Sequence, residues 1–136
     1  MAQLSSPRAA EFVGWLIVAM VLFTDRVFQV WSYTVGMGRL LLRSPKSPGA
    51  VTRVDVLFQN VKALKLPTRL EGLSVRSPTD EELRAIETDA GFREDGNTQV
   101  FVVEGKNYTG YVVAGVVVAR EDTGEYGDPS TLTGDV

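Results

Sequence analysis

The chain has 136 residues and a formal net charge of −3, and it contains neither cysteine nor histidine. This composition excludes disulfides, metal sites built on Cys or His, Cys nucleophiles and His general bases. Ten Lys and Arg against four Asp and Glu lie in residues 1–76, whereas residues 77–136 hold four against thirteen. A basic first half therefore precedes an acidic second half.

The N-terminal part, residues 1–43, is predicted to be a long helix that binds a membrane or a partner. From Phe12 to Val35 the chain is largely apolar, with one charged pair at Asp25-Arg26. Such a helix would extend over about 36 Å, enough to cross a hydrocarbon core of about 30 Å. Glu11, directly before the apolar run, argues against a cleaved signal peptide. A single spanning helix is the preferred interpretation; a helix lying in the membrane interface and a helix buried in a soluble oligomer are the alternatives.

Polar residues recur at steps of three and four along the second half of this predicted helix. They would share one face, and they are Asp25, Gln29, Ser32, Gly36, Arg39 and Arg43. A carboxylate at membrane depth is costly unless a partner pairs with it. We therefore expect this face to contact another protein chain, with Arg26 reaching an interface or a second partner. The candidate partner-binding residues are Asp25, Arg26, Gln29, Ser32 and Gly36.

The residues that follow the apolar run suggest an orientation and a boundary. Basic residues cluster on the C-terminal side of the run, and the positive-inside tendency then places the C-terminal domain in the cytoplasm. Ser44-Pro45-Lys46-Ser47-Pro48-Gly49 holds two prolines and a glycine, which end a helix. Residues 44–50 are accordingly predicted to be a linker.

Residues 51–120 are predicted to form a small α+β domain of mostly antiparallel strands with one short helix. Val54, Val56 and Phe58 alternate with Asp55, Leu57 and Gln59, which is typical of a strand, and residues 70–75 predict another short strand. The helix is expected to begin with Ser77 as its N-cap and to end at Gly91.

Several details of this helix and of the strands after it are also predicted. Three carboxylates, Asp80, Glu81 and Glu82, lie in the first turn, where the helix dipole favours negative charge. Leu83, Ile86 and Ala90 would lie on one face. Residues 98–103 and 108–119 predict a β-hairpin, with residues 112–119 as a central strand covered on both faces. Gly110 and Gly115 are expected at bulges or close approaches.

The last residues, 121–136, are acidic and poor in large apolar groups, which is typical of a flexible tail. If the tail is ordered, we expect a neighbouring subunit to hold it.

No motif in the chain predicts catalysis, a metal site or a cofactor. Gly36-Met37-Gly38 lacks the strand–turn–helix context of a phosphate-binding loop, and the sequence pI of about 5.0 disfavours nucleic-acid binding. The sequence therefore predicts a non-enzymatic accessory or structural subunit of a multi-protein membrane assembly. A structural protein of a virus or phage particle is the alternative, and a membrane-tethered small-molecule sensor is a more distant one.

Overall fold

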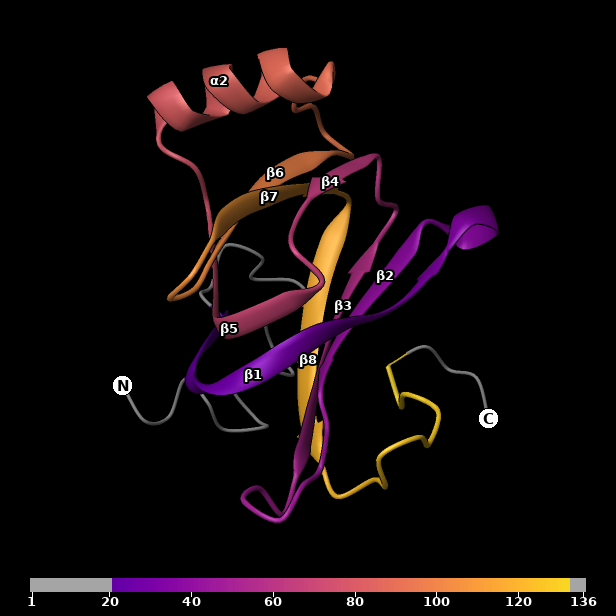
Figure 1. The fold of residues 1–136 in the computed structure, drawn as a ribbon. Helices are drawn as coiled ribbons and strands as arrows, with labels where there is room; N and C mark the ends of the chain where they lie inside the picture. Colours follow the sequence, from indigo (N-terminus) through magenta and orange to yellow (C-terminus); the bar gives the residue numbers. More distant parts are fainter. Residues whose placement is uncertain (1–20, 133–136) are drawn as a thin grey trace.

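The computed structural model describes residues 21–132, which form one antiparallel sheet of eight strands and one α-helix (Figure 1). The strands are β1 (Val21–Thr34), β2 (Arg39–Ser44), β3 (Arg53–Gln59), β4 (Ala63–Lys65), β5 (Arg69–Arg76), β6 (Gln99–Glu104), β7 (Thr109–Ala114) and β8 (Val116–Asp122). A short 3₁₀-helix, η2 (Val35–Met37), joins β1 to β2, and the α-helix α2 (Asp80–Ala90) joins β5 to β6. Neighbouring strands follow the order β4-β7-β6-β5-β1-β2-β3-β8.

The sheet closes on itself. In the strand order, β4 and β8 stand at opposite ends, and each of them continues along the chain from a strand near the other end of the sheet. β4 follows β3 after residues 60–62, and β8 follows β7 after Gly115. The two bent strand pairs lie side by side, since β3 pairs with β8 and β4 pairs with β7. The Lys62 N–H donates to the Val113 carbonyl over 2.7 Å, and the Gly115 N–H donates to the Gln59 carbonyl over 2.9 Å. The single strand predicted over residues 112–119 is thus divided at Gly115, one of the two glycines expected at an irregularity.

The core fills the inside of this closed sheet. Val54, Val56 and Phe58 of β3 point inward, which confirms the alternation predicted for that strand. The Phe58 and Phe101 rings lie 5.8 Å apart edge to face, and Phe23 packs on Phe28 at the same distance. Burial of these side chains is the main stabilising contribution.

Helix α2 covers part of the outer face of the sheet, above β6 and β7 (Figure 1). Leu83, Ile86 and Ala90 are partly buried and pack against a buried patch of the sheet, which confirms that they share one face. That patch consists of Val100, Tyr111 and Val113. The three acidic residues of the first turn and the end of the helix at Gly91 are also confirmed. The predicted N-cap is wrong by two residues, because Thr79 and not Ser77 caps the helix, in a capping box with Glu82.

The predicted fold class, an α+β chain led by a long helix, is wrong. Residues 21–34 form a strand paired with β2 on one side and β5 on the other, and residues 39–44 form the next strand. Within residues 21–132, no helix has the length and apolar character needed to cross a membrane. The earlier part of the predicted helix, residues 1–20, lies outside the described residues.

The error has a local cause in the registers of β1. Residues 27–34 are rich in Val, Phe, Trp, Tyr and Thr, which favour strands. The register of β1 shifts between Phe23 and Val27 against β5, and again between Val30 and Ser32 against β2. Such irregularities interrupt the two-residue alternation of a strand, so the spacing of polar residues resembles that of a helix.

Candidate functional site

The β1–β2 hairpin ends in a turn that holds apolar side chains in solvent. The exposed fractions are 78% for Val35, 57% for Met37 and 43% for Tyr33. We call these three residues, with Gly36 between them, the hairpin tip. In Figure 1 the indigo hairpin carries this turn away from the body of the sheet. Val27, at 38%, is the other exposed large hydrophobic residue of the two strands, whereas Phe28, Leu40, Leu41 and Leu42 are buried.

The turn has a defined conformation that fixes the tip. Pairing of β1 with β2 continues to Thr34 and Arg39, directly below the tip. Gly38 adopts a left-handed conformation with φ of 59°, and its N–H donates to the Val35 carbonyl over 3.3 Å. The Gly38 carbonyl accepts a hydrogen bond of 2.9 Å from the Val61 N–H, which ties the base of the turn to the corner after β3.

Two hollows flank the hairpin tip, and Met37 and Arg39 line both of them. The first, of about 260 Å³, lies between the hairpin and residues near the C-terminus. Its lining residues are Trp31, Ser32, Thr34, Met37, Arg39, Leu41, Arg43, Leu57, Gly127, Asp128, Pro129 and Ser130. The second, of about 680 Å³, is lined by Gly36, Met37, Arg39, Gln59, Asn60, Gly96, Asn97, Gly115 and Val116.

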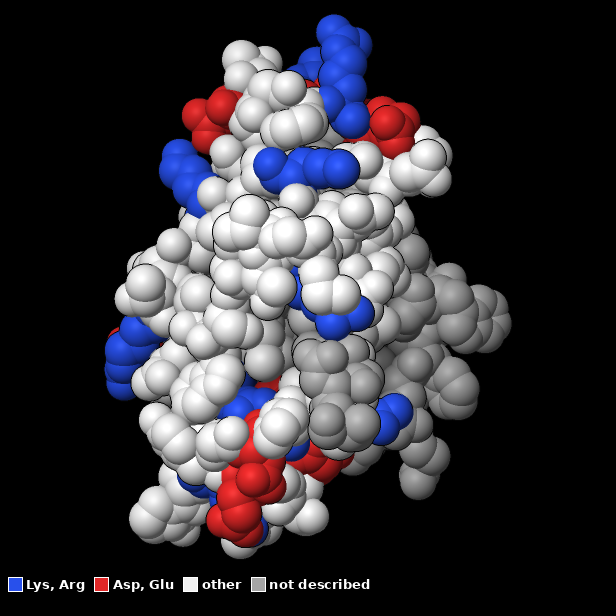
Figure 2. Space-filling view, turned by 90° about the vertical axis from the view of Figure 1, so that its right-hand side faces the viewer, with Lys and Arg blue, Asp and Glu red and all other residues white. Residues whose placement is uncertain are grey.

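Figure 2 views the molecule from the side on which the hairpin ends. A broad, mostly uncharged area separates charged residues around α2 at the top from a second group of charged residues at the bottom. The turn of the hairpin thus ends on a face with few charges, and the charged residues that line the hollows beside it are Arg39, Arg43 and Asp128.

An ion pair underlies the first hollow. The Arg43 Nε donates to Asp55 Oδ1 over 2.7 Å and its Nη2 donates to Oδ2 over 3.1 Å, and both side chains are only 1% exposed. The Trp31 ring covers the guanidinium, whose central carbon lies 5.0 Å from the ring centroid. Tyr126 packs edge-on against Trp31 at 5.1 Å. The floor of the hollow is therefore held by charge, stacking and hydrogen bonds together.

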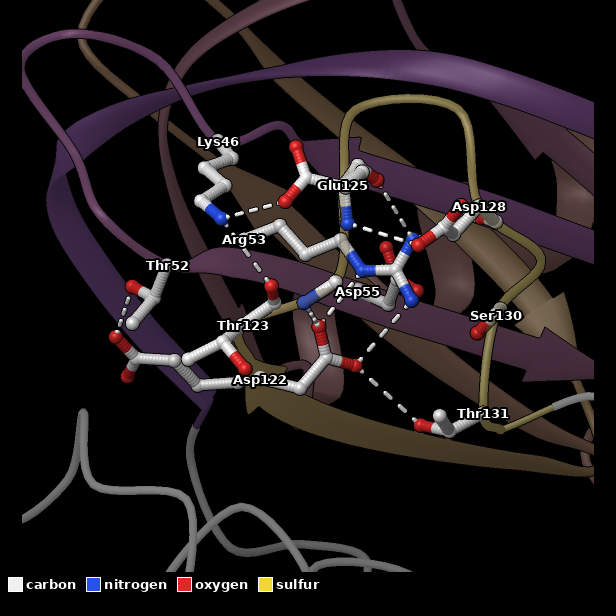
Figure 3. A network of polar contacts seen from close by, with 12 residues as sticks. Lys46, Thr52, Arg53, Asp55, Asp122, Thr123, Glu125, Asp128, Ser130 and Thr131 are labelled. Atoms are coloured by element: carbon white, nitrogen blue, oxygen red, sulfur yellow. Dashed lines mark hydrogen bonds and ion pairs between the residues drawn. The ribbon is translucent and has the colours of Figure 1, made fainter.

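Residues 123–132, which we call the strap, cross the outer face of β2 and β3 and form the other wall of this hollow (Figure 3). Two arginines donate hydrogen bonds to its main-chain carbonyls. Arg43 donates to the carbonyl of Tyr126, and Arg53 donates to three further carbonyls of the strap. The Arg53 acceptors are the carbonyls of Glu125, Asp128 and Pro129, at 3.2, 2.7 and 3.0 Å. These contacts come from the same chain, not from the neighbouring subunit that the sequence predicted for an ordered tail.

The start of the strap is fixed by Asp122, at the end of β8. Arg53 Nε donates to Asp122 Oδ1 over 2.7 Å, and the Gly124 N–H donates to the same oxygen over 2.9 Å. Burial, the largest influence, raises the pKa of the Asp122 carboxyl, but the hydrogen bonds from Arg53 and Gly124 hold it below its usual range. Asp122 is therefore an anion that keeps Arg53 in place beneath the strap.

The structure separates the residues predicted to bind a partner. Ser32 lines the first hollow and Gly36 the second, so both lie at the hairpin end described above. Gln29 is exposed midway along β1, paired through its backbone with Arg43 and Arg69. Asp25 and Arg26 lie further back along β1, and Asp25 is exposed. These five residues do not form one polar face.

Arg26 has an intramolecular role in the structure. Its Nη2 donates to the Thr52 carbonyl over 2.7 Å, and its Nη1 lies 4.0 Å from a carboxylate oxygen of Glu121. It therefore links β1 to the approach to β3 and to the end of β8. Interpretation of the sequence missed the apolar hairpin tip, although Gly36 and Gly38 between two runs of strand-favouring residues are a signal for a turn there.

Among residues 21–132, acidic side chains do not gather in groups of three or more that could hold a metal ion. Comparison of the chain with protein-family models, curated proteins and solved structures gave no match.

Proposed function

We propose that this protein is a non-enzymatic accessory subunit that docks onto a larger surface through its hairpin tip. The observation that carries the proposal is the exposure of Val35, Met37 and Tyr33 on a turn of fixed conformation. Exposed apolar groups gathered in one place are typical of interaction sites. Full burial of a Val or Met side chain contributes about 1.5–3 kcal/mol, so the tip alone supports a binding free energy of a few kcal/mol.

The surroundings of the tip support docking over a wider area. The two hollows adjoin it, and Met37 and Arg39 form part of both linings. The backbone of the turn is held by pairing up to Thr34 and Arg39 and by the bond between Gly38 and Val61. Little conformational entropy is lost when a surface of this kind binds, which favours association.

A pair of matched variants tests the proposal. Val35→Ser combined with Met37→Ser removes the apolar groups of the tip, whereas Val51→Ser changes a valine that is 76% exposed in the connection between β2 and β3. The full-length protein in mild-detergent extracts of its native cells should migrate in a large complex on native gradients. The tip variant should migrate as the free subunit, and Val51→Ser should behave as the wild type.

Either of two results would reject the proposal. The wild-type protein could migrate as a monomer in the extract, or the tip variant could keep the size of the wild-type complex. Circular dichroism and thermal unfolding of the purified variants serve as the folding control. Because both changes replace exposed valine or methionine, the native fold should persist in all three proteins.

A further inference from the structure

We infer that the surface entered by the hairpin tip is the interfacial layer of a lipid bilayer. This inference rests on the proposed function and names the partner of the same site. It also relocates the predicted membrane contact, because residues 31–37 belong to a β-hairpin and its turn and not to a spanning helix.

The order of side chains along the hairpin follows the polarity gradient of a bilayer. Val35 and Met37 lie at the end, with the largest exposed fractions among the large hydrophobic residues of the hairpin. Tyr33 and Arg39 lie behind them, at the ends of β1 and β2 that the turn joins, and Tyr33 is also exposed. Tyrosine favours the headgroup region, and arginine extends its charge towards headgroups while its stem remains among apolar groups.

The charge at the base of the turn is suited to an anionic headgroup layer. The sequence contains no Asp or Glu between Asp25 and Asp55. Of the five Lys or Arg residues in that interval, four form ion pairs within the fold, namely Arg26, Arg43, Lys46 and Arg53. The fifth, Arg39, lies directly at the base of the turn and lines both hollows. The area around the tip in Figure 2 is otherwise mostly uncharged. An approach of the tip to phosphate groups is therefore not opposed by carboxylates of the hairpin. The one carboxylate that lines either hollow, Asp128 of the strap, accepts a hydrogen bond from the Glu125 N–H.

The size of the tip limits how deep it enters. The antiparallel pairing stops at Thr34 and Arg39, so only η2 and its side chains extend beyond the ladder. Apolar groups that bind a membrane interface enter about 5–10 Å into the boundary of headgroups and acyl chains. Val35 and Met37 therefore insert shallowly and reversibly into the membrane interface.

The absence of cysteine from the chain allows a direct test. An environment-sensitive fluorophore is attached to full-length protein through Val35→Cys, and through Val51→Cys as the matched control. Vesicles of phosphatidylcholine with phosphatidylglycerol are added, with and without nitroxide-labelled acyl chains. The label at position 35 should shift to the blue and be quenched by the nitroxide, and the label at position 51 should do neither. Vesicle affinity should fall at least tenfold in the Val35→Ser, Met37→Ser variant.

The outcomes separate this inference from the proposed function. Suppose that vesicles neither shift nor quench the label at position 35, while the tip variant still loses its complex. The partner of the hairpin tip is then a protein: the lipid inference is wrong, and the docking proposal stands. If vesicle binding is unchanged in the tip variant, lipid contact lies elsewhere and the inference is overturned. A tip variant that keeps both its complex and its vesicle affinity contradicts both.

Discussion

Arg43 and Asp55 show how one pair of residues depends on several parts of the fold. They lie on the outer face of the sheet, opposite the core, yet each is only 1% exposed. Trp31 and the strap cover them, and the Arg43 Nη1 donates to the Tyr126 carbonyl over 3.1 Å. A buried ion pair is tolerated when its hydrogen-bonding groups are satisfied, and removal of one partner leaves a costly unpaired charge.

Asp55→Ala is therefore expected to destabilise the protein by about 3–5 kcal/mol, because Arg43 then remains buried without its carboxylate. The double variant Arg43→Met, Asp55→Leu should recover a large part of that loss. Urea unfolding followed by Trp fluorescence measures both free energies. Glu71→Ala is the control, since its ion pair with Arg69 is solvent-exposed and is worth at most about 1 kcal/mol. Equal losses for Asp55→Ala and Glu71→Ala would contradict the argument.

At the scale of elements, the sequence predicted those strands and helix ends that depend on a local residue pattern. The alternation of Val54, Val56 and Phe58 indicated a strand with one face in the core, and the carboxylates and Gly91 indicated the bounds of α2 to within a few residues. The sequence misled over residues 21–43, because two register shifts in β1 interrupt its alternation. Those shifts depend on pairing with β2 and β5, which is tertiary information.

The start of α2 contains a pH-sensitive contact. Arg76 donates two hydrogen bonds of 2.8 Å to the Glu82 carboxylate, and the Thr79 N–H donates a third of the same length. The bond from Arg76 is the larger influence, and together these contacts lower the pKa of Glu82 from 4.5 to about 2. The contact joins the end of β5 to the helix that covers β6 and β7.

Because the folded-state pKa of Glu82 is depressed, its stabilising contribution is present above about pH 4.5 and is lost as the pH falls towards 2. The side chain is about one-third exposed, so solvent screening limits the contribution to about 1 kcal/mol. Unfolding free energies of the wild type and Glu82→Gln should differ most at pH 6 and converge towards pH 2. Glu81→Gln, a second first-turn carboxylate, is the control and should show a smaller gap. A gap for Glu82→Gln that stays constant with pH would disprove the assignment.

At the scale of the whole molecule, the closed sheet is covered at two places on its outside. Helix α2 covers one part, and the strap covers another, whereas the hairpin tip remains exposed. Attachment of the strap could not be predicted from sequence, because Arg43 and Arg53 bind its main-chain carbonyls, which every residue carries. The strap also forms one wall of the hollow beside the hairpin tip. For the same reason, no sequence motif predicts this hollow.

Gly124 is the position at which attachment of the strap is tested most directly. A Cβ there would lie 2.5 Å from the Cζ and Nη2 atoms of Arg53. That guanidinium cannot swing away without cost, because it bonds Asp122 and three strap carbonyls. Gly124→Ala is therefore expected to release the strap and to destabilise the protein by about 1–3 kcal/mol. At Gly127, by contrast, no described atom lies within 4 Å of the Cβ position, so Gly127→Ala is the matched control.

Hydrogen–deuterium exchange over residues 123–132 measures the release. Amides of the strap should lose protection in Gly124→Ala and keep it in Gly127→Ala. Trp31 should report the same event, because the Tyr126 ring that packs on it at 5.1 Å leaves with the strap and the fluorescence of Trp31 changes. The hairpin tip does not depend on the strap for its own hydrogen bonds, so vesicle binding through Val35 and Met37 should survive release. If both glycine variants kept the exchange protection of the wild type, the arginine contacts would not be what holds the strap on β2 and β3.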